Sequence, residues 1–133
     1  MRTKLAVLVA GIALLTSARI MAHHSFSAEF DANKPFKMTG TVTKVEWMNP
    51  HTFFYIDVKD EKTGKVTNWA MEMGSPNGLM RAGWTRNTMK AGDLVTVEGS
   101  LAKDGSPTGN ARSVTMAADG KRLFAASSQG NTQ

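Results

Sequence analysis

Three histidines, His23, His24 and His51, are the residues whose type and spacing best suit a chemical role in this chain. If the chain begins at His23, its α-amino group and ring Nδ1 form one chelate. The amino group has a pKa of only ~7.7–8.0, so a metal ion can displace its proton near neutral pH. A third nitrogen makes a planar set that suits Cu(II). His51 is the favoured third ligand, because adjacent side chains such as those of His23 and His24 point apart in an extended segment.

The alternative is that the terminal histidines are simply solvated and that His51 hydrogen-bonds within its own turn.

The metal hypothesis also needs the chain to begin at His23. Residues 5–15 are apolar throughout, which suits the core of a signal peptide and is shorter than the ~20 residues that span a bilayer. We predict that residues 1–22 are a signal peptide, that it is cleaved after Ala22, and that the protein is periplasmic; cleavage after Ala18 is the other option.

Composition narrows the remaining function classes. The sequence has no cysteine, which excludes thiolate catalysis, iron–sulfur clusters and cysteine zinc sites. Without Arg2, Lys4 and Arg19, thirteen basic residues face eleven acidic ones, and the net charge falls from +5 to +2. That small charge, like the export signal, argues against nucleic-acid binding. After the predicted signal peptide, no apolar run is long enough to cross a membrane, so we expect no membrane-spanning segment. We predict one domain over residues 23–126, with an N-terminal arm, and a disordered polar tail over residues 127–133.

Alternating apolar and polar residues predict β-strands along most of the chain. The expected strands cover residues 41–47, 52–58, 66–73, 94–101, 111–117 and 121–125. Ser75 as a cap and Pro76 at the first helical position predict a short helix that ends near Gly83. This order predicts a mainly β fold, a small OB-like barrel of five to six antiparallel strands with one short helix between strands three and four. An immunoglobulin-like β-sandwich is the alternative.

Several side chains of these strands offer a second kind of site. Trp47, Tyr55 and Trp84 are candidate ligand-binding residues on an aromatic barrel face, with Trp84 expected to be partly exposed. Met71 and Met73 are expected in the core beside Trp69, although thioethers are also soft ligands for Cu(I). The strand carboxylates are expected on solvated faces; they are Glu46, Asp57 and Glu72.

Four segments of the chain form a distinctive pattern. They are HHSFSAEFDANKPF (23–36), GTVTKVEWMNPH (40–51), VTNWAMEMGSPNGLMRAGW (66–84) and KAGDLVTVEGSLAKDGS (90–106). Together they resemble an exported bacterial family, domain of unknown function 6152. The resemblance implies a periplasmic protein whose mature chain begins near the HHSF segment, and it supplies no activity. Met71 and Met73 depart from the phenylalanine and leucine expected there.

Two functions remain in view at this point. The first is a periplasmic metal-binding protein, a copper carrier or buffer in which His23 chelates the ion and His51 completes the site. The second is a metal-free binding module whose aromatic face holds an envelope ligand or a periplasmic partner protein. A copper redox enzyme ranks below both. No serine nucleophile motif, phosphate loop or HExxH motif is present, so nothing in the sequence demands an enzyme.

Overall fold

The computed structural model describes residues 26–127. The predicted signal peptide, His23 and His24 lie outside these residues, so the prediction of cleavage after Ala22 stays a prediction. The predicted tail overlaps the described residues only at Ser127, which is buried. The elements are β1 (Phe30–Glu46), β2 (Phe53–Lys59), β3 (Val66–Glu72), α2 (Pro76–Arg81), β4 (Leu94–Ala102), β5 (Thr108–Met116) and β6 (Arg122–Phe124).

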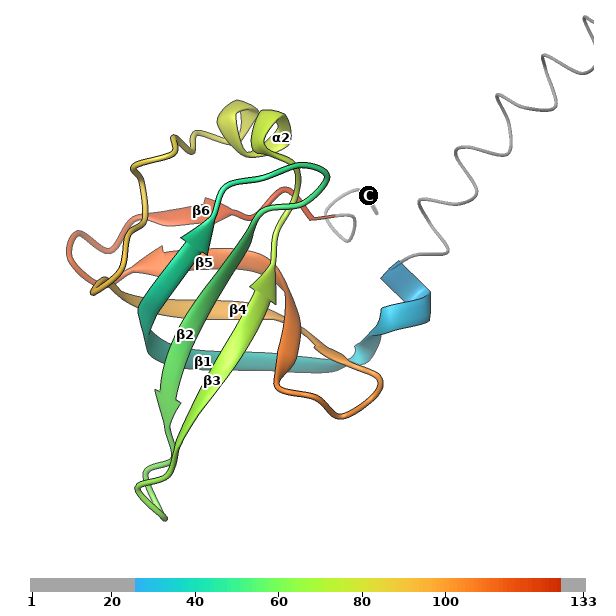
Figure 1. Ribbon diagram of the computed structural model, residues 1–133, viewed down its shortest axis with the longest axis vertical. Coiled ribbons are helices and arrows are strands. Elements are labelled where there is room, and N and C mark those ends of the chain that lie inside the picture. The colour runs from blue at the N-terminus through green and yellow to red at the C-terminus, as the bar shows by residue number, and fades with distance from the viewer. Residues whose placement is uncertain (1–25, 128–133) are drawn as a thin grey trace, which may run out of the picture.

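All six strands belong to one sheet that closes on itself (Figure 1). Strands β1, β2 and β3 form an antiparallel meander, and β1 also pairs with β4 along its other edge. Strand β5 pairs antiparallel with β4 and parallel with β3, where Glu72 lies opposite Asn110. These pairings make a ring of five strands, with β6 added beside β5. The predicted OB-like, mainly β fold is confirmed. The alternative, an immunoglobulin-like sandwich, would have two separate sheets instead of one.

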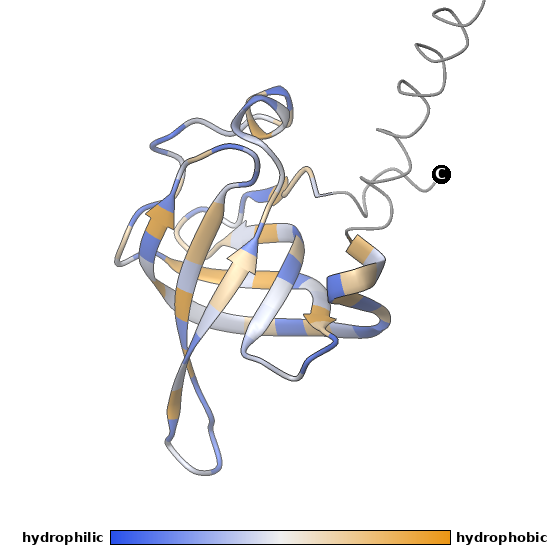
Figure 2. Ribbon diagram, turned by 45° about the vertical axis from the view of Figure 1, so that its right-hand side comes forward, coloured by the Kyte–Doolittle hydropathy of each residue, from blue (hydrophilic) through white to orange (hydrophobic). Residues whose placement is uncertain are grey.

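The core is a cluster of buried apolar residues that comes mainly from the strands, along which hydrophobic and hydrophilic residues interchange (Figure 2). Phe54 and Ile56 of β2 are fully buried, and Met71, which pairs with Phe54, and Met73 have exposed fractions of 0% and 1%. The expectation that these two methionines pack in the core is therefore confirmed. Trp69 is only partly buried and packs against the edge of the same cluster.

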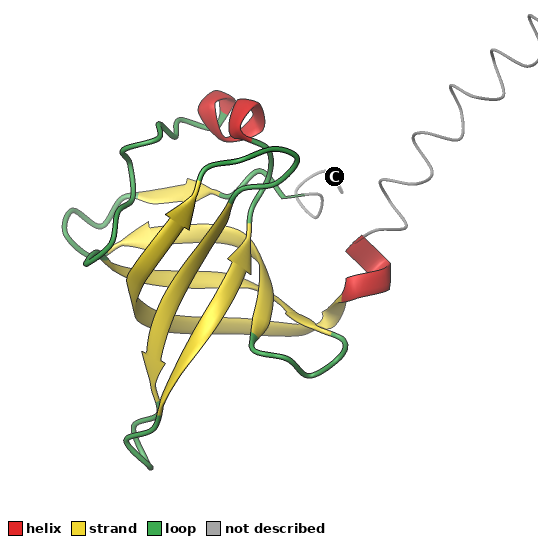
Figure 3. Cartoon of the chain, viewed as in Figure 1, coloured by secondary structure: helices red, strands yellow, loops and turns green. Residues whose placement is uncertain are grey.

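The helix α2 lies at one end of the closed sheet (Figure 3). The Ser75 hydroxyl accepts a hydrogen bond from the backbone N–H of Gly78 at 3.2 Å, and Pro76 opens the helix, as the sequence predicts. The connection after α2 carries Trp84 and Met89 back to the core, where both are buried. This connection, rather than the helix alone, therefore completes that end of the core.

Two strands are longer than the alternation predicts. Strand β1 begins at Phe30 rather than at residue 41, because its first part pairs with β4, from Phe30 opposite Ala102 to Gly40 opposite Val95. Strand β5 begins at Thr108 rather than at residue 111, because its first residues pair with β3. In both places the strand is held by backbone pairing and most side chains are exposed or small, so hydrophobic periodicity does not reveal it.

This core predicts a fold that is independent of metal ions. Thermal unfolding should show one cooperative transition with or without a chelator, because the buried cluster consists of apolar side chains from the strands and the α2–β4 connection. Circular dichroism and calorimetry in buffer and in excess chelator would measure it. A chain that is unfolded in chelator would contradict the prediction, since the metal would then be structural.

Candidate functional site

His51 lies in the loop between β1 and β2, and the backbone holds it beside the end of β3. The N–H of Thr52 donates to the carbonyl of Gly74 at 3.0 Å, and the N–H of Met73 donates to the carbonyl of Thr52 at 2.8 Å. The imidazole thereby reaches Glu72, with Nδ1 3.0 Å from Oε1. The side chain of His51 is 43% exposed and that of Glu72 only 13%. Since Nδ1 faces the carboxylate, Nε2 is the nitrogen free to meet a ligand.

The carboxyl of Glu72 has a pKa shifted from its ordinary value. Burial raises the pKa of its carboxyl; the neighbouring His51 lowers it in part, and the negative charge of Glu29 raises it further. The net pKa is above the ordinary value of 4.5. Glu72 was expected on a solvated strand face, and this expectation is wrong, because the His51 loop and the parallel contact with β5 cover it.

The raised pKa of Glu72 predicts a specific pH dependence of stability. The folded protein holds the Glu72 proton to a higher pH than the unfolded chain does, so unfolding free energy declines as the pH rises from about 4.5 through the folded pKa. Glu72→Gln removes this decline. Relative to the wild type, the variant should therefore gain stability as the pH rises through this window, as measured by urea unfolding between about pH 4 and pH 7.

The matched control is Glu61→Gln in the exposed β2–β3 loop, which makes the same change in net charge. A Glu72→Gln variant that loses stability relative to the wild type as the pH rises would contradict the prediction. That result would mean that the ion pair with His51 outweighs the cost of burying the carboxylate.

Buried polar atoms gather around the same end of the sheet. Among the described residues, the side-chain oxygens of Thr52, Asn110 and Ser127 are buried and have no hydrogen-bond partner in the protein. Thr52 follows His51, and Asn110 lies opposite Glu72 in β5. Buried polar atoms without a protein partner are commonly satisfied by water or an ion. The His51–Glu72 pair therefore stands in a polar setting at the edge of an apolar core.

The N-terminal turn, residues 26–29, forms one helical turn directly before β1. It is fastened to the β4–β5 loop, where the Lys103 ammonium donates to the carbonyl of Ser27 and the Lys103 N–H donates to the carbonyl of Glu29. The rings of Phe26 and Phe30 stack with their centroids 5.6 Å apart. The end of the described chain is thus held in place, with Glu29 close enough to Glu72 to influence its pKa.

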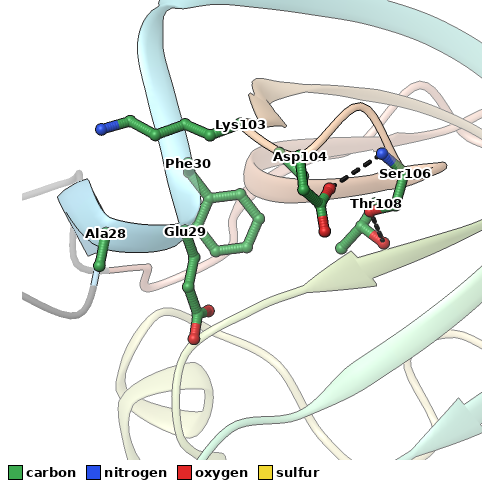
Figure 4. A pocket seen from close by; sticks show the side chains of 8 residues that line it. Ala28, Glu29, Phe30, Lys103, Asp104, Ser106 and Thr108 are labelled. Carbon is green, nitrogen blue, oxygen red and sulfur yellow. Dashed lines mark hydrogen bonds between the residues drawn. The ribbon is translucent and has the colours of Figure 1, made fainter.

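An open cavity of about 520 Å³ lies between this turn and the β4–β5 loop (Figure 4). Its lining residues are Ala28, Glu29, Phe30, Ala102, Lys103, Asp104, Ser106 and Thr108. The Ser106 side chain, and then the Ser106 backbone N–H that donates to the Asp104 carboxylate at 2.9 Å, lower the pKa of Asp104. Sequence reasoning missed Glu29 and this cavity, because both depend on the first part of β1 pairing with β4.

The three predicted aromatic residues do not form one face. Trp84 was expected to be partly exposed, and this is wrong: it is 2% exposed and its indole N–H donates to the carbonyl of Phe124 at 2.9 Å. Trp47 is partly buried and lines a narrow cavity together with Trp84. Tyr55 instead lies on the outer face of β2, where its hydroxyl donates to Glu46 at 3.1 Å.

The structure describes only one of the predicted metal ligands. Over residues 26–127, no group of three or more histidine, cysteine, aspartate or glutamate side chains is arranged to hold a metal ion. His51 could supply one metal ligand. The other predicted ligands, His23 and His24, lie outside the described residues. None of the helices in the described part is long and apolar enough to cross a membrane.

These features define a small protein with a closed OB-type sheet, a histidine–carboxylate pair at one end and a fastened N-terminal turn. Residues 12–112 match a family of unknown function, DUF6152, and the chain belongs to that family. The resemblance found in the four sequence segments is thereby confirmed. No curated protein and no solved structure matches the chain.

Proposed function

We propose that this is an exported, periplasmic metal-binding protein, a copper carrier or buffer. His23 would chelate Cu(II) through its α-amino group and Nδ1, and His51 would add Nε2, with His24 as a lesser candidate. The observation that carries the proposal is the orientation of His51, whose Nδ1 is 3.0 Å from the Glu72 carboxylate. Histidines that bind metals commonly donate their other ring N–H to a carboxylate, which fixes the ring and makes it a better ligand.

The position of the N-terminal turn supports the proposal. Its residue Glu29 adds a negative charge that raises the pKa of Glu72. His23 precedes Phe26 by three residues, so a chelate at His23 would lie within roughly 10 Å of the turn. The partly buried carboxylate of Glu72 would also favour a cation beside it.

The test uses the protein exported with its own signal peptide, after intact mass and N-terminal sequencing establish its first residue. Titration with Cu(II), followed by visible absorption and electron paramagnetic resonance, should show about one ion in nitrogen-rich planar coordination. His51→Ala should weaken binding, and so should one extra residue before His23, because it removes the free amine from the chelate. Affinity should also fall as the pH falls, since protons compete for the ligands.

Two further variants separate the roles of the neighbouring residues. Glu72→Gln should cost about 10–100-fold in affinity, the usual effect of losing a partner that orients a ligand. His24→Ala should change affinity less than His51→Ala does. If the native and the extended protein bind copper equally well, the amine is not a ligand and the proposed site is wrong.

A second candidate, a metal-free binding module, is favoured by one observation. The half-buried Phe53 and Tyr55 alternate with core residues on β2, which places them on the outer face of the sheet. In OB folds the face of the second and third strands holds ligands. This module would become the leading reading if the copper titration fails.

A further inference from the structure

The open cavity between the N-terminal turn and the β4–β5 loop supplies none of the ligands of the copper site proposed above. Its volume of about 520 Å³ lies within the range of roughly 300–1,000 Å³ that is usual for small-molecule sites. Apolar lining comes from Ala28, Phe30 and Ala102, and hydroxyl groups come from Ser106 and Thr108. The cavity therefore has the room and the mixed lining that a small organic molecule needs, and its charges determine which kind.

The charged residues of the lining favour a cation. Glu29 on the turn and Asp104 on the loop both line the cavity (Figure 4). Hydrogen bonds from the side chain and the backbone of Ser106 lower the pKa of Asp104, so this carboxylate is ionised at neutral pH. The basic residue of the lining is Lys103, whose ammonium donates to the carbonyl of Ser27 and points away from both carboxylates (Figure 4). A ligand in the cavity therefore meets mainly negative charge.

From this lining we propose that the cavity binds a short organic dication, an aliphatic diamine, with one ammonium group beside Glu29 and the other beside Asp104. Hydrogen bonds between ionised partners of this kind are stronger than those between neutral groups. The methylene chain of the diamine would contact the apolar lining at Phe30 and Ala102. A metal ion fits less well, because it would occupy little of the volume and because residues 26–127 hold no group of three or more metal-ligating side chains.

A buried acceptor in the same strand as the cavity wall also favours a ligand that brings hydrogen-bond donors. Thr108 and Asn110 are two residues apart in β5, so their side chains leave the strand on the same face. Asn110 is 1% exposed, and its Oδ1 has no hydrogen-bond partner in the protein. An ammonium group has three N–H donors and no acceptor, so it can satisfy this oxygen directly or through a water molecule. An anionic ligand would bring acceptors only.

The experiment titrates the processed protein at neutral pH with three probes that share a five-carbon chain: 1,5-diaminopentane, 1,5-pentanediol and glutarate. Calorimetry gives the affinities, and amide chemical shifts locate the site. We expect one bound diamine, with the diol and the dicarboxylate weaker by about tenfold or more. The largest shifts should fall at Glu29, Asp104, Ser106 and Thr108. Affinity for the diamine should also decrease as salt is added, because salt screens the charges.

The variant Glu29→Gln/Asp104→Asn removes both charges and keeps an oxygen that can accept the Ser106 N–H. It should lose about tenfold or more in affinity for the diamine. The matched control is Glu61→Gln/Asp119→Asn, which makes the same change in net charge at two exposed residues outside the cavity and should bind as the wild type does.

Four outcomes would overturn the proposal. They are a wild type that binds no diamine, a diol that binds equally well, a cavity variant that keeps its affinity, and a surface control that loses as much. The single variant Asp104→Asn separates this proposal from the copper site, on which it does not depend. It should bind the diamine more weakly and Cu(II) as the wild type does, because Asp104 contributes nothing to the proposed copper ligands. Normal diamine binding by this single variant would count against the site as well.

Discussion

Replacing Trp84 with alanine should lower the free energy of unfolding by about 3–5 kcal/mol. The side chain is 2% exposed and packs in the main hydrophobic cluster, so its removal leaves a large cavity. Its indole N–H also donates to the carbonyl of Phe124 at 2.9 Å, which ties the α2–β4 connection to β6. Urea unfolding at neutral pH, with the slope compared between variants, measures the loss.

Two companion variants divide this effect into its parts. Trp84→Phe keeps most of the aromatic volume and removes the indole N–H, so it should cost about 1–3 kcal/mol, from imperfect packing and from the loss of the hydrogen bond to the Phe124 carbonyl. Trp69→Ala should cost less than Trp84→Ala, because Trp69 is only partly buried. A loss below about 1 kcal/mol for Trp84→Ala would contradict its assignment to the core.

The burial of Trp84 illustrates what local sequence does not contain. Between Gly83 and Arg86 it has the surroundings of a loop residue, and it is buried because β6 passes behind it nearly forty residues later. By contrast, Met71 in β3 and Met73 directly after that strand follow an alternation that alone places them inside. Core positions on regular strands were therefore predictable, and core positions in connections were not.

The strand order was predictable for a related reason. The meander, the Ser75-capped helix and the later strands follow from local signals, and the OB arrangement is the known way to close such a series. The pairings that lengthen β1 and β5 join residues far apart in sequence, such as Phe30 with Ala102 and Ala70 with Thr108. They depend on the closed shape of the sheet, which no local window records.

The candidate site was likewise predictable only in part. The position of His51 just before the second strand could be read from the break at Asn49–Pro50 and the strand that follows. Its carboxylate partner could not, because Glu72 reaches it only through the register of β2 with β3 and the backbone bonds of Thr52. The turn that carries Glu29 is held where it is only because the first part of β1 is a strand paired with β4.

The pairing of β4 with β5 gives the second large expected effect, at Gly99 in β4. A Cβ added there would overlap the backbone oxygen of Asn110 in the paired strand β5 and lie 2.9 Å from its carbonyl carbon. These are backbone atoms held in the ladder, so they cannot move aside as a flexible side chain can. Gly99→Val should therefore cost about 3 kcal/mol or more, at the upper end of the range for overpacked sites.

The control for Gly99→Val is Gly105→Val in the β4–β5 loop, where an added Cβ meets nothing within 4 Å and only the positive φ of 77° opposes the change. That strain alone should cost about 1–2 kcal/mol. Equal losses in the two variants, measured by urea unfolding, would show that the close approach at Gly99 is relieved at no cost.

Asn110 also lies opposite Glu72 in the parallel pairing of β3 with β5. Displacing it should loosen that contact, so a Gly99→Val protein that still folds should bind Cu(II) more weakly than the Gly105→Val protein if the proposed site exists.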